Sequence, residues 1–179
     1  MTLKILNHEI IGKIDKLDEK LEGKLPITRE ELLVLVNSWG REQDFKFIYD
    51  NQTINFISIK KSKPKECYDL SRLDTSKIKN MNCLFIYSNF NGDISNWDTS
   101  NVTSMNSMFY KTKKFNNDII KWNTSKVIDM HKMFCFTKKF NQDIGKWDVS
   151  NVTSMNSMFY FSRKFNKNLN KWNTSKLIN

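Results

Sequence analysis

Two residues have the types and spacing of a catalytic pair, because a histidine and a cysteine lie one helical turn apart. His131 and Cys135 are four positions apart, and a thiol beside an imidazole is the arrangement that activates a cysteine nucleophile. The flanking copies of the repeat described below have Asn and Tyr at these positions. The sequence offers no third group to orient the imidazole and no oxyanion donor, so we predict that the protein is not an enzyme.

Metal and cofactor chemistry has equally little support. The three cysteines are Cys67, Cys83 and Cys135, an odd number with no metal-ligand spacing, which favours a reducing compartment over a disulfide framework. The chain has only five glycines and no glycine-rich loop that would hold a phosphate. We therefore predict no metal and no cofactor.

Basic and aromatic residues at a fixed period are the stronger chemical signal. Pairs of cations precede a phenylalanine in three successive copies, and a single lysine precedes a tryptophan in the same copies. The cation pairs are Lys113/Lys114, Lys138/Lys139 and Arg163/Lys164, and the single lysines are Lys121, Lys146 and Lys171. If copies stack at the spacing of paired strands, each column becomes a stripe with a step of about 5 Å, which suits a polyanion.

Four aromatic residues lie beside these cations in the sequence, and we expect them to be exposed. They are Tyr110, Phe136, Tyr160 and Phe161. Such rings can stack on bases or fill pockets of a protein partner. The alternative is an ordinary solvated lysine face, and lysines alone would confer no sequence specificity on a nucleic-acid complex.

The charge of the chain is concentrated in the part that holds these columns. The net charge is +10 overall, but residues 73–179 hold 16 Lys and Arg against seven Asp, which is +9. Five of those Asp occupy two repeat columns and have the positions of turn and capping residues. The imbalance indicates an acidic or polyanionic partner.

A repeat of 25 residues must position these side chains. Trp97, Trp122, Trp147 and Trp172 keep this step, and residues 97–110 and 147–160 differ only at Thr99 and Val149. The 3, 3, 1 spacing of the V-x-x-M-x-x-M-F phrase predicts a short helix in each copy, and the F-N-x-D-I phrase predicts a short strand. We therefore predict an α/β repeat, a short right-handed solenoid.

Two further features of the repeat lead to expectations. The Asn column 91/116/141/166 should form a ladder whose amides satisfy loop backbone groups. Residues 172–179 begin another copy without its M-x-x-M-F phrase. This segment is either a minimal cap or a place where a second copy or a partner docks.

The N-terminal part, residues 1–66, should cap the repeats at 67–179. Apolar residues predict an amphipathic helix over 3–22, and the Thr28-x-x-Glu31 box predicts a second helix that runs through Trp39 and stops at Gly40. Alternation over residues 44–60 predicts a β-hairpin around Asp50-Asn51, followed by a basic linker at 60–66.

The phrase F-N-x-D-I-x-x-W-[DN]-[TV]-S-x-V-x-x-M-x-x-M-F resembles the short repeat of BspA-like bacterial surface proteins, which are relatives of leucine-rich-repeat proteins. The resemblance covers residues 73–179. It implies a leucine-rich-repeat-like right-handed solenoid that binds other macromolecules, and in many members an adhesin-like surface role.

These observations predict a non-enzymatic, macromolecule-binding protein with an N-terminal helical and β-hairpin cap. One form is an inhibitor from a phage or mobile element that acts on a host nucleic-acid-handling complex such as an RNA-guided nuclease. The alternatives are an adhesin-like surface module and a non-specific RNA or DNA binder. The partner would be a protein or ribonucleoprotein, with a homodimer through the N-terminal helix or the C-terminal end as a further alternative. The absence of a signal peptide and of a long apolar run predicts a cytoplasmic protein without membrane insertion.

Overall fold

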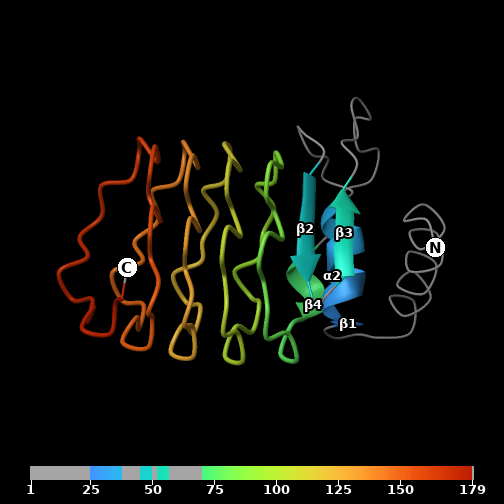
Figure 1. The fold of residues 1–179 in the computed structure, drawn as a ribbon, viewed down its shortest axis with the longest axis horizontal. Coiled ribbons are helices and arrows are strands. Elements are labelled where there is room, and N and C mark those ends of the chain that lie inside the picture. Colours follow the sequence, from blue (N-terminus) through green and yellow to red (C-terminus); the bar gives the residue numbers. More distant parts are fainter. Residues whose placement is uncertain (1–24, 38–44, 50–51, 57–69, 179) are drawn as a thin grey trace.

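The computed structural model describes residues 25–37, 45–49, 52–56 and 70–178. In chain order these residues form β1 (Leu25–Pro26), α2 (Arg29–Asn37), β2 (Phe45–Tyr49), β3 (Gln52–Phe56), the 3₁₀ helix η1 (Leu70–Arg72) and β4 (Leu73–Asp74). After β4 the successive repeats lie side by side as a stack of layers (Figure 1). The helix predicted at 3–22 and the linker predicted at 60–66 fall outside the described residues.

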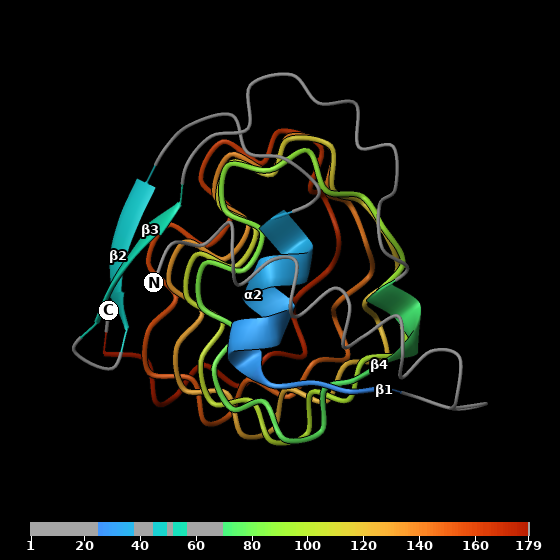
Figure 2. The ribbon, with the colours of Figure 1, turned by 90° about the vertical axis from the view of Figure 1, so that its right-hand side faces the viewer.

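The capping box that opens α2 is confirmed. The Glu31 N–H donates to Thr28 Oγ1 at 3.2 Å, and Glu31 Oε2 accepts from the Thr28 N–H at 2.9 Å. Leu32, Leu35 and Val36 are buried against the first layer. Figure 2 shows α2 lying across the end of the stack. The expected stop at Gly40 lies outside the part that the structure describes.

The hairpin is confirmed as well. Strands β2 and β3 pair antiparallel, with Phe45 opposite Phe56 and Tyr49 opposite Gln52. A second short pairing joins the segment before α2 to the first layer, because β1 lies parallel to β4 with Leu25 opposite Leu73. Both pairings lie at one end of the stack (Figure 1).

The predicted fold class, an α/β repeat with a leucine-rich-repeat-like right-handed solenoid, is wrong. In residues 70–178 the structure has no α-helix, and its regular elements there are η1 and the two-residue β4. The layers are built of turns joined by single parallel bridges, from Asn80 to Ser104, on to Asp129 and then to Ser154. The short strand and the short helix expected in each repeat are both absent.

The M-x-x-M-F phrase cannot form a helix because its amides bond to another layer. The Ser107, Phe109 and Lys111 N–H groups donate to carbonyls of the next layer at 2.8, 2.9 and 2.9 Å. The alternate amides close tight turns within the layer, as Met108 N–H does to Met105 O at 3.2 Å. A left-handed residue between these turns, such as Ser107 at φ 54°, interrupts any helical run. We call the bonds between layers the inter-layer ladder.

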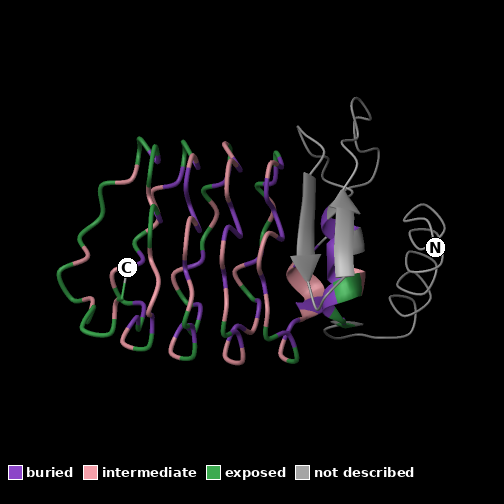
Figure 3. Ribbon diagram, in the orientation of Figure 1, coloured by how far each residue is buried: buried purple, intermediate pink, exposed green. Residues whose placement is uncertain are grey.

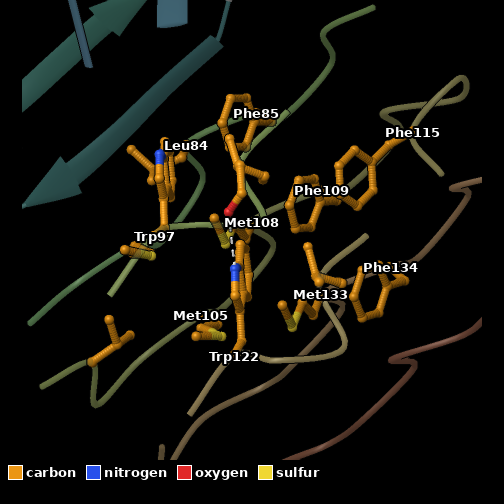
Figure 4. Packing of buried hydrophobic residues seen from close by; sticks show 14 of the residues in the cluster. Leu84, Phe85, Trp97, Met105, Met108, Phe109, Phe115, Trp122, Met133 and Phe134 are labelled. Atoms are coloured by element: carbon orange, nitrogen blue, oxygen red, sulfur yellow. Dashed lines mark hydrogen bonds between the residues drawn. The ribbon is translucent and has the colours of Figure 1, made fainter. Parts of the chain in front are cut away.

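Columns of stacked rings fill the interior. Phe85, Phe109, Phe134 and Phe159 lie 5.3, 5.5 and 5.8 Å apart between successive centroids. The Trp column keeps 6.3 Å and then 6.4 Å from Trp97 through Trp147. Burying such a side chain contributes roughly 1.5–3 kcal/mol. Figure 3 shows that buried positions recur along the ribbon of the inner layers, and Figure 4 shows rings such as Phe85, Phe109 and Phe134 in successive layers.

Polar columns register the layers. The indole N–H of each Trp in the column from Trp97 to Trp172 donates to a carbonyl that precedes it by one layer. The bond from Trp122 Nε1 to Ile94 O is 3.1 Å long (Figure 4). The predicted Asn ladder is confirmed, because the Asn116 N–H donates to Asn91 Oδ1 at 2.8 Å and the Asn141 N–H to Asn116 Oδ1 at 2.8 Å. Each of these two columns thus adds one hydrogen bond between successive layers.

Candidate macromolecule-binding surface

Five aromatic side chains from successive layers form a surface strip, which we call the aromatic strip. Its members are Tyr87, Tyr110, Phe136, Tyr160 and Phe161. Centroid distances along the strip are 5.5 Å from Tyr87 to Tyr110, 6.1 Å on to Phe136, and then 5.6 Å to Tyr160 and 5.1 Å to Phe161. Tyr160 and Phe161 are 56% and 44% exposed. Large exposed rings in contact with one another are typical of recognition surfaces.

The backbone explains why the strip is continuous. Tyr87, Lys111, Phe136 and Phe161 have φ of 57°, 57°, 59° and 55°. These four residues are equivalent in successive layers, so the same left-handed turn places each side chain at the same point of its layer. For a residue other than glycine this conformation costs roughly 1–2 kcal/mol, which the ladder bonds of the Tyr87, Lys111 and Phe136 N–H groups help to offset.

Lys111 lies among three rings of the aromatic strip. Its Nζ is 5.0 Å from the centroid of Tyr87, 5.4 Å from that of Tyr110 and 5.7 Å from that of Phe136. Each cation–π contact at an exposed site contributes about 0.5–1 kcal/mol. The strip is therefore cationic as well as aromatic.

The predicted cation pairs begin two residues beyond the strip. Lys114, Lys138, Lys139, Arg163 and Lys164 are exposed, and Lys113 is half-buried. Arg163 joins the two sets directly, since its guanidinium carbon is 5.5 Å from the Phe161 centroid. Equivalent residues follow the layer step, which the ring columns put between 5.3 and 6.4 Å.

The second predicted column, that of the single lysines, is exposed but makes no cation–π contact with the aromatic strip within the described part of the chain. Lys121, Lys146 and Lys171 are all exposed. Among the residues that the structure describes, no cation–π contact links them to the aromatic strip. The structure thus brings together the four predicted aromatic residues and, through Arg163, the cation pairs, while the single-lysine column stays apart.

Sequence reasoning missed Tyr87 and Lys111 at the strip. Aligning the residue two positions after each core Phe (85, 109, 134 and 159) would have found them, because that column contains Tyr, Lys, Phe and Phe. A third column, also missed, alternates Lys and Asn at positions 77, 101, 126, 151 and 176. Here Lys126 Nζ donates to Asn101 Oδ1 at 2.7 Å and Lys176 Nζ to Asn151 Oδ1 at 2.6 Å.

The aspartates are held in turns, as expected from their columns. Asp98 Oδ1 accepts from the Ser100 N–H at 2.9 Å, and Asp148 Oδ1 accepts from the Ser150 N–H at 3.0 Å. Hydrogen bonds from Ser150 hold the pKa of Asp148 below its ordinary value. Bonds from Ser95 do the same for the pKa of Asp93. These carboxylates accept hydrogen bonds within their own turns.

The arrangement around His131 and Cys135 is that of a structural cysteine. Cys135 is buried, and burial raises the pKa of its thiol, whereas a nucleophilic cysteine needs a lowered pKa. The helix that would have set the two side chains one turn apart is absent, and the His131 N–H donates to Asp129 Oδ1 at 2.8 Å. In the described part of the chain no three His, Cys, Asp or Glu residues lie together in a group that could hold a metal ion.

A family model described as "Mycoplasma protein of unknown function, DUF285" matches residues 56–172. This match covers more than half of the chain, and the chain belongs to that family. No curated protein and no solved structure matches the chain. Within the described residues, no helix combines the length and the apolar character needed to span a membrane.

Proposed function

We propose that this chain is a non-enzymatic binding module that holds a macromolecule with an acidic surface against the aromatic strip and the cation pairs beside it. One observation supports this most directly: Lys111 lies among Tyr87, Tyr110 and Phe136 on a surface that continues to Phe161 and Arg163. Rings supply contact area, and the cations select an acidic partner.

A folded acidic protein suits this surface better than a nucleic acid. The five strip rings contact one another, either edge to face or stacked (Tyr110 and Phe136 at 79°, Phe136 and Phe161 at 19°). A nucleic-acid groove instead needs separate ring faces on which successive bases can stack. Rings already packed together favour a protein surface with apolar contacts inside an acidic rim.

The partner's cellular location distinguishes two forms of this proposal. In the first, the protein is a cytoplasmic inhibitor from a phage or mobile element that binds a host nucleic-acid-handling complex such as an RNA-guided nuclease. The +10 charge supports this form. In the second, it is an adhesin-like module of the BspA-like group. The resemblance of the repeat phrase over residues 73–179 supports that form.

Variants of the strip test the proposal. The experiment captures partners from cell lysate, with and without nuclease treatment. Phe136→Ala with Tyr160→Ala should weaken capture of a partner that survives the nuclease by about tenfold or more, because central aromatic anchors dominate interfaces. The matched control is Lys77→Ala with Lys126→Ala, which removes two cations from the Lys–Asn column. Equal binding by both variants would contradict the proposal, and loss of all capture on nuclease digestion would favour direct binding of RNA or DNA.

Location is tested separately. Labelling of intact cells with an antibody should reach the adhesin-like form and should miss the cytoplasmic form. For the inhibitor form, added protein should reduce target cleavage by the purified nuclease complex in a concentration-dependent way. Unchanged cleavage together with surface labelling would leave the adhesin-like form.

A further inference from the structure

The layers of the stack are spaced like the turns of an α-helix. Equivalent ring centroids of successive layers lie 5.3, 5.5 and 5.8 Å apart, in the column that runs from Phe85 through Phe109 and Phe134 to Phe159. One turn of an α-helix advances about 5.4 Å along its axis. An apolar stripe at positions i, i+4, i+7 and i+11 of a helix therefore supplies about one side chain for each layer.

An extended polypeptide does not keep this step. Side chains on one face of a β-strand recur at about 6.8 Å, which exceeds the layer step by about 1 Å or more. The mismatch adds up from layer to layer, so a strand that lies along the stack loses register with the layers after about two or three of them. A helix in the same place keeps its register.

The rings of the aromatic strip alternate in orientation at a similar step. Tyr87 and Tyr110 lie edge to face at 87°, Tyr110 and Phe136 at 79°, and Phe136 and Tyr160 at 82°. Their centroids are 5.5, 6.1 and 5.6 Å apart in the same order. The interval between successive rings thus recurs about once per helical turn. Apolar side chains one turn apart fit successive intervals, in the way that the side-chain ridges of packed helices interdigitate.

The chain on either side of these rings carries cations and no acids. Residues 105–117, which include Tyr110, and residues 130–142, which include Phe136, contain no Asp or Glu. Each of the two segments contains three lysines, which are Lys111, Lys113 and Lys114 in the first and Lys132, Lys138 and Lys139 in the second. Carboxylates beside the apolar stripe of a partner helix would complement them.

The charge is not uniform along the strip. Residues 80–92, which surround Tyr87, contain no charged side chain. The cation nearest to the Tyr87 ring by a recorded contact is Lys111 of the next layer, whose Nζ is 5.0 Å from the centroid. A helix that follows the strip therefore needs acids on the turns over the layers of Tyr110 and Phe136, and an apolar or neutral turn over the layer of Tyr87.

We propose that the partner of the aromatic strip presents an acidic amphipathic α-helix, which lies along the stack with one turn on each layer. Its apolar stripe packs against Tyr110 and Phe136, and the carboxylates beside that stripe pair with Lys113 and Lys138. Recognition of a helix through apolar anchors at this spacing is a general mode of peptide binding. The inference rests on the proposed function, because it names the element of the partner that the strip binds.

Three synthetic peptides with the same numbers of Ala, Leu and Glu test the proposal. In the first, Leu occupies i, i+4, i+7 and i+11 and Glu lies along an edge of that stripe. In the second, the Glu residues move to the opposite face of the helix. In the third, Leu and Glu alternate as in a strand. Fluorescence anisotropy of labelled peptide with the full chain should give the first an affinity about tenfold or more above each of the others.

Circular dichroism and NMR describe the bound state of the first peptide. It should be helical, and nuclear Overhauser effects should connect successive Leu methyl groups to the Tyr110 and Phe136 rings in turn. Equal affinity of the first peptide and either of the others would overturn the proposal. A bound peptide that is not helical, or that contacts neither ring, would overturn it as well.

Matched variants separate the strip from the rest of the surface. Phe136→Ala should weaken binding of the first peptide by about tenfold. Ile128→Ala, which removes an apolar side chain that is 49% exposed in the same layer, should leave binding near that of the parent.

Charge variants keep the rings in place, so they stay informative if Phe136→Ala lowers the folded fraction. Lys113→Glu with Lys138→Glu should weaken binding of the first peptide by about tenfold. Lys121→Glu with Lys146→Glu makes the same change in the single-lysine column and should have little effect. An equal effect of the test and control variants, in the rings or in the charges, would overturn the proposal.

Failure of this inference is distinguishable from failure of the proposed function. If partner capture from lysate depends on Phe136 and Tyr160 while the first peptide binds no better than the others, the helix proposal is wrong and the proposed function stands. If capture does not depend on these two residues, both are wrong. Tighter binding of single-stranded oligouridylate than of the first peptide at the same rings would assign the strip to nucleic acid and overturn both.

Discussion

Thr99 Oγ1 donates a 2.9 Å hydrogen bond to the backbone carbonyl of Asn123 in the next layer. Thr75 and Thr124 make the equivalent bonds, to Asp98 O at 2.9 Å and Asp148 O at 2.8 Å. The column then changes at Val149, which is buried and has no hydroxyl. The one difference between residues 97–110 and 147–160 therefore removes a bond between the last two layers.

Thr99→Val should destabilise the stack. The variant keeps the side-chain volume but leaves the Asn123 carbonyl without its donor, and an unsatisfied buried group costs about 1–3 kcal/mol. The free energy of unfolding, measured in urea, should fall by that amount. Thr103→Val is the control, because the Thr103 hydroxyl bonds to Lys79 O at an exposed site where water can replace it. An equal effect of both substitutions would contradict the role of the column.

Arg29→Lys should also destabilise the protein, although the charge is kept. A lysine ammonium cannot reproduce the guanidinium geometry that reaches both Asn80 O and Asn82 O. We expect a loss of about 1–3 kcal/mol in the free energy of unfolding, together with faster amide exchange in α2. Glu30→Gln, at an exposed position next along α2, should change neither quantity. An unaffected Arg29→Lys protein would show that the first layer needs no donors from α2.

The turn aspartates make stability depend on pH. The pKa values of Asp93 and Asp148 are lowered in the folded protein, so their contribution is present above the ordinary value of 3.8 and is lost as the pH falls below it. Asp93→Asn with Asp148→Asn should flatten the fall in Tm below about pH 4. Near pH 7 the double variant should lose little, because Asn123 Oδ1 makes the same turn bond to the Ser125 N–H at 3.1 Å. If the Tm of the double variant fell below about pH 4 as steeply as that of the parent, this assignment would be refuted.

The alternation of Lys and Asn between layers should matter most at low ionic strength. Asn101→Lys would place three cations in successive layers at positions 77, 101 and 126, and it would remove the oxygen that accepts from Lys126 Nζ. We expect a drop in Tm at about 10 mM salt that shrinks at about 1 M salt, because the Debye length falls from about 30 Å to 3 Å. Asn101→Gln keeps a neutral amide and should lack this salt dependence. A drop in Tm that does not depend on salt would mean that Asn101→Lys acts by disturbing packing and not by charge repulsion.

Much of the local structure could be predicted from the sequence. The Thr28 capping box, the pairing of β2 with β3 and the Asn ladder from Asn91 onward are all present, because each depends on side-chain chemistry visible in a short phrase. The turn role of Asp98 follows the same logic. The 25-residue step of the Trp column, which indicated stacked copies, appears as ring contacts at 6.3 Å between Trp97 and Trp122.

The class of structure within each copy could not be predicted in this way. The spacing of Val102, Met105, Met108 and Phe109 fits a helix, yet the same spacing fits successive tight turns that point every third residue inward. Ladder bonds from Phe109 to the next layer decide between the two, and these bonds exist only once layers have stacked. The left-handed φ at Ser107 is likewise imposed by the ladder, because serine has no intrinsic preference for it.

The candidate surface could be predicted from the sequence only in part. Tyr160 and Phe161 are exposed as expected, whereas Tyr110 and Phe136 are half-buried. The contacts among these four rings were not predicted. The place of Lys111 among the rings required the structure, because a single lysine in an otherwise aromatic column gives no signal by itself.

The most direct test of the binding account is capture of a nuclease-resistant partner by the parent chain and by a triple variant, Lys113→Glu with Lys138→Glu and Arg163→Glu. These positions lie two residues beyond Lys111, Phe136 and Phe161, in three successive layers. The control is Lys77→Glu with Lys126→Glu and Lys176→Glu, which changes the same number of charges in the Lys–Asn column. The account predicts that the first set abolishes capture and the second leaves most of it. Equal capture by both sets, at equal folded stability, would contradict it.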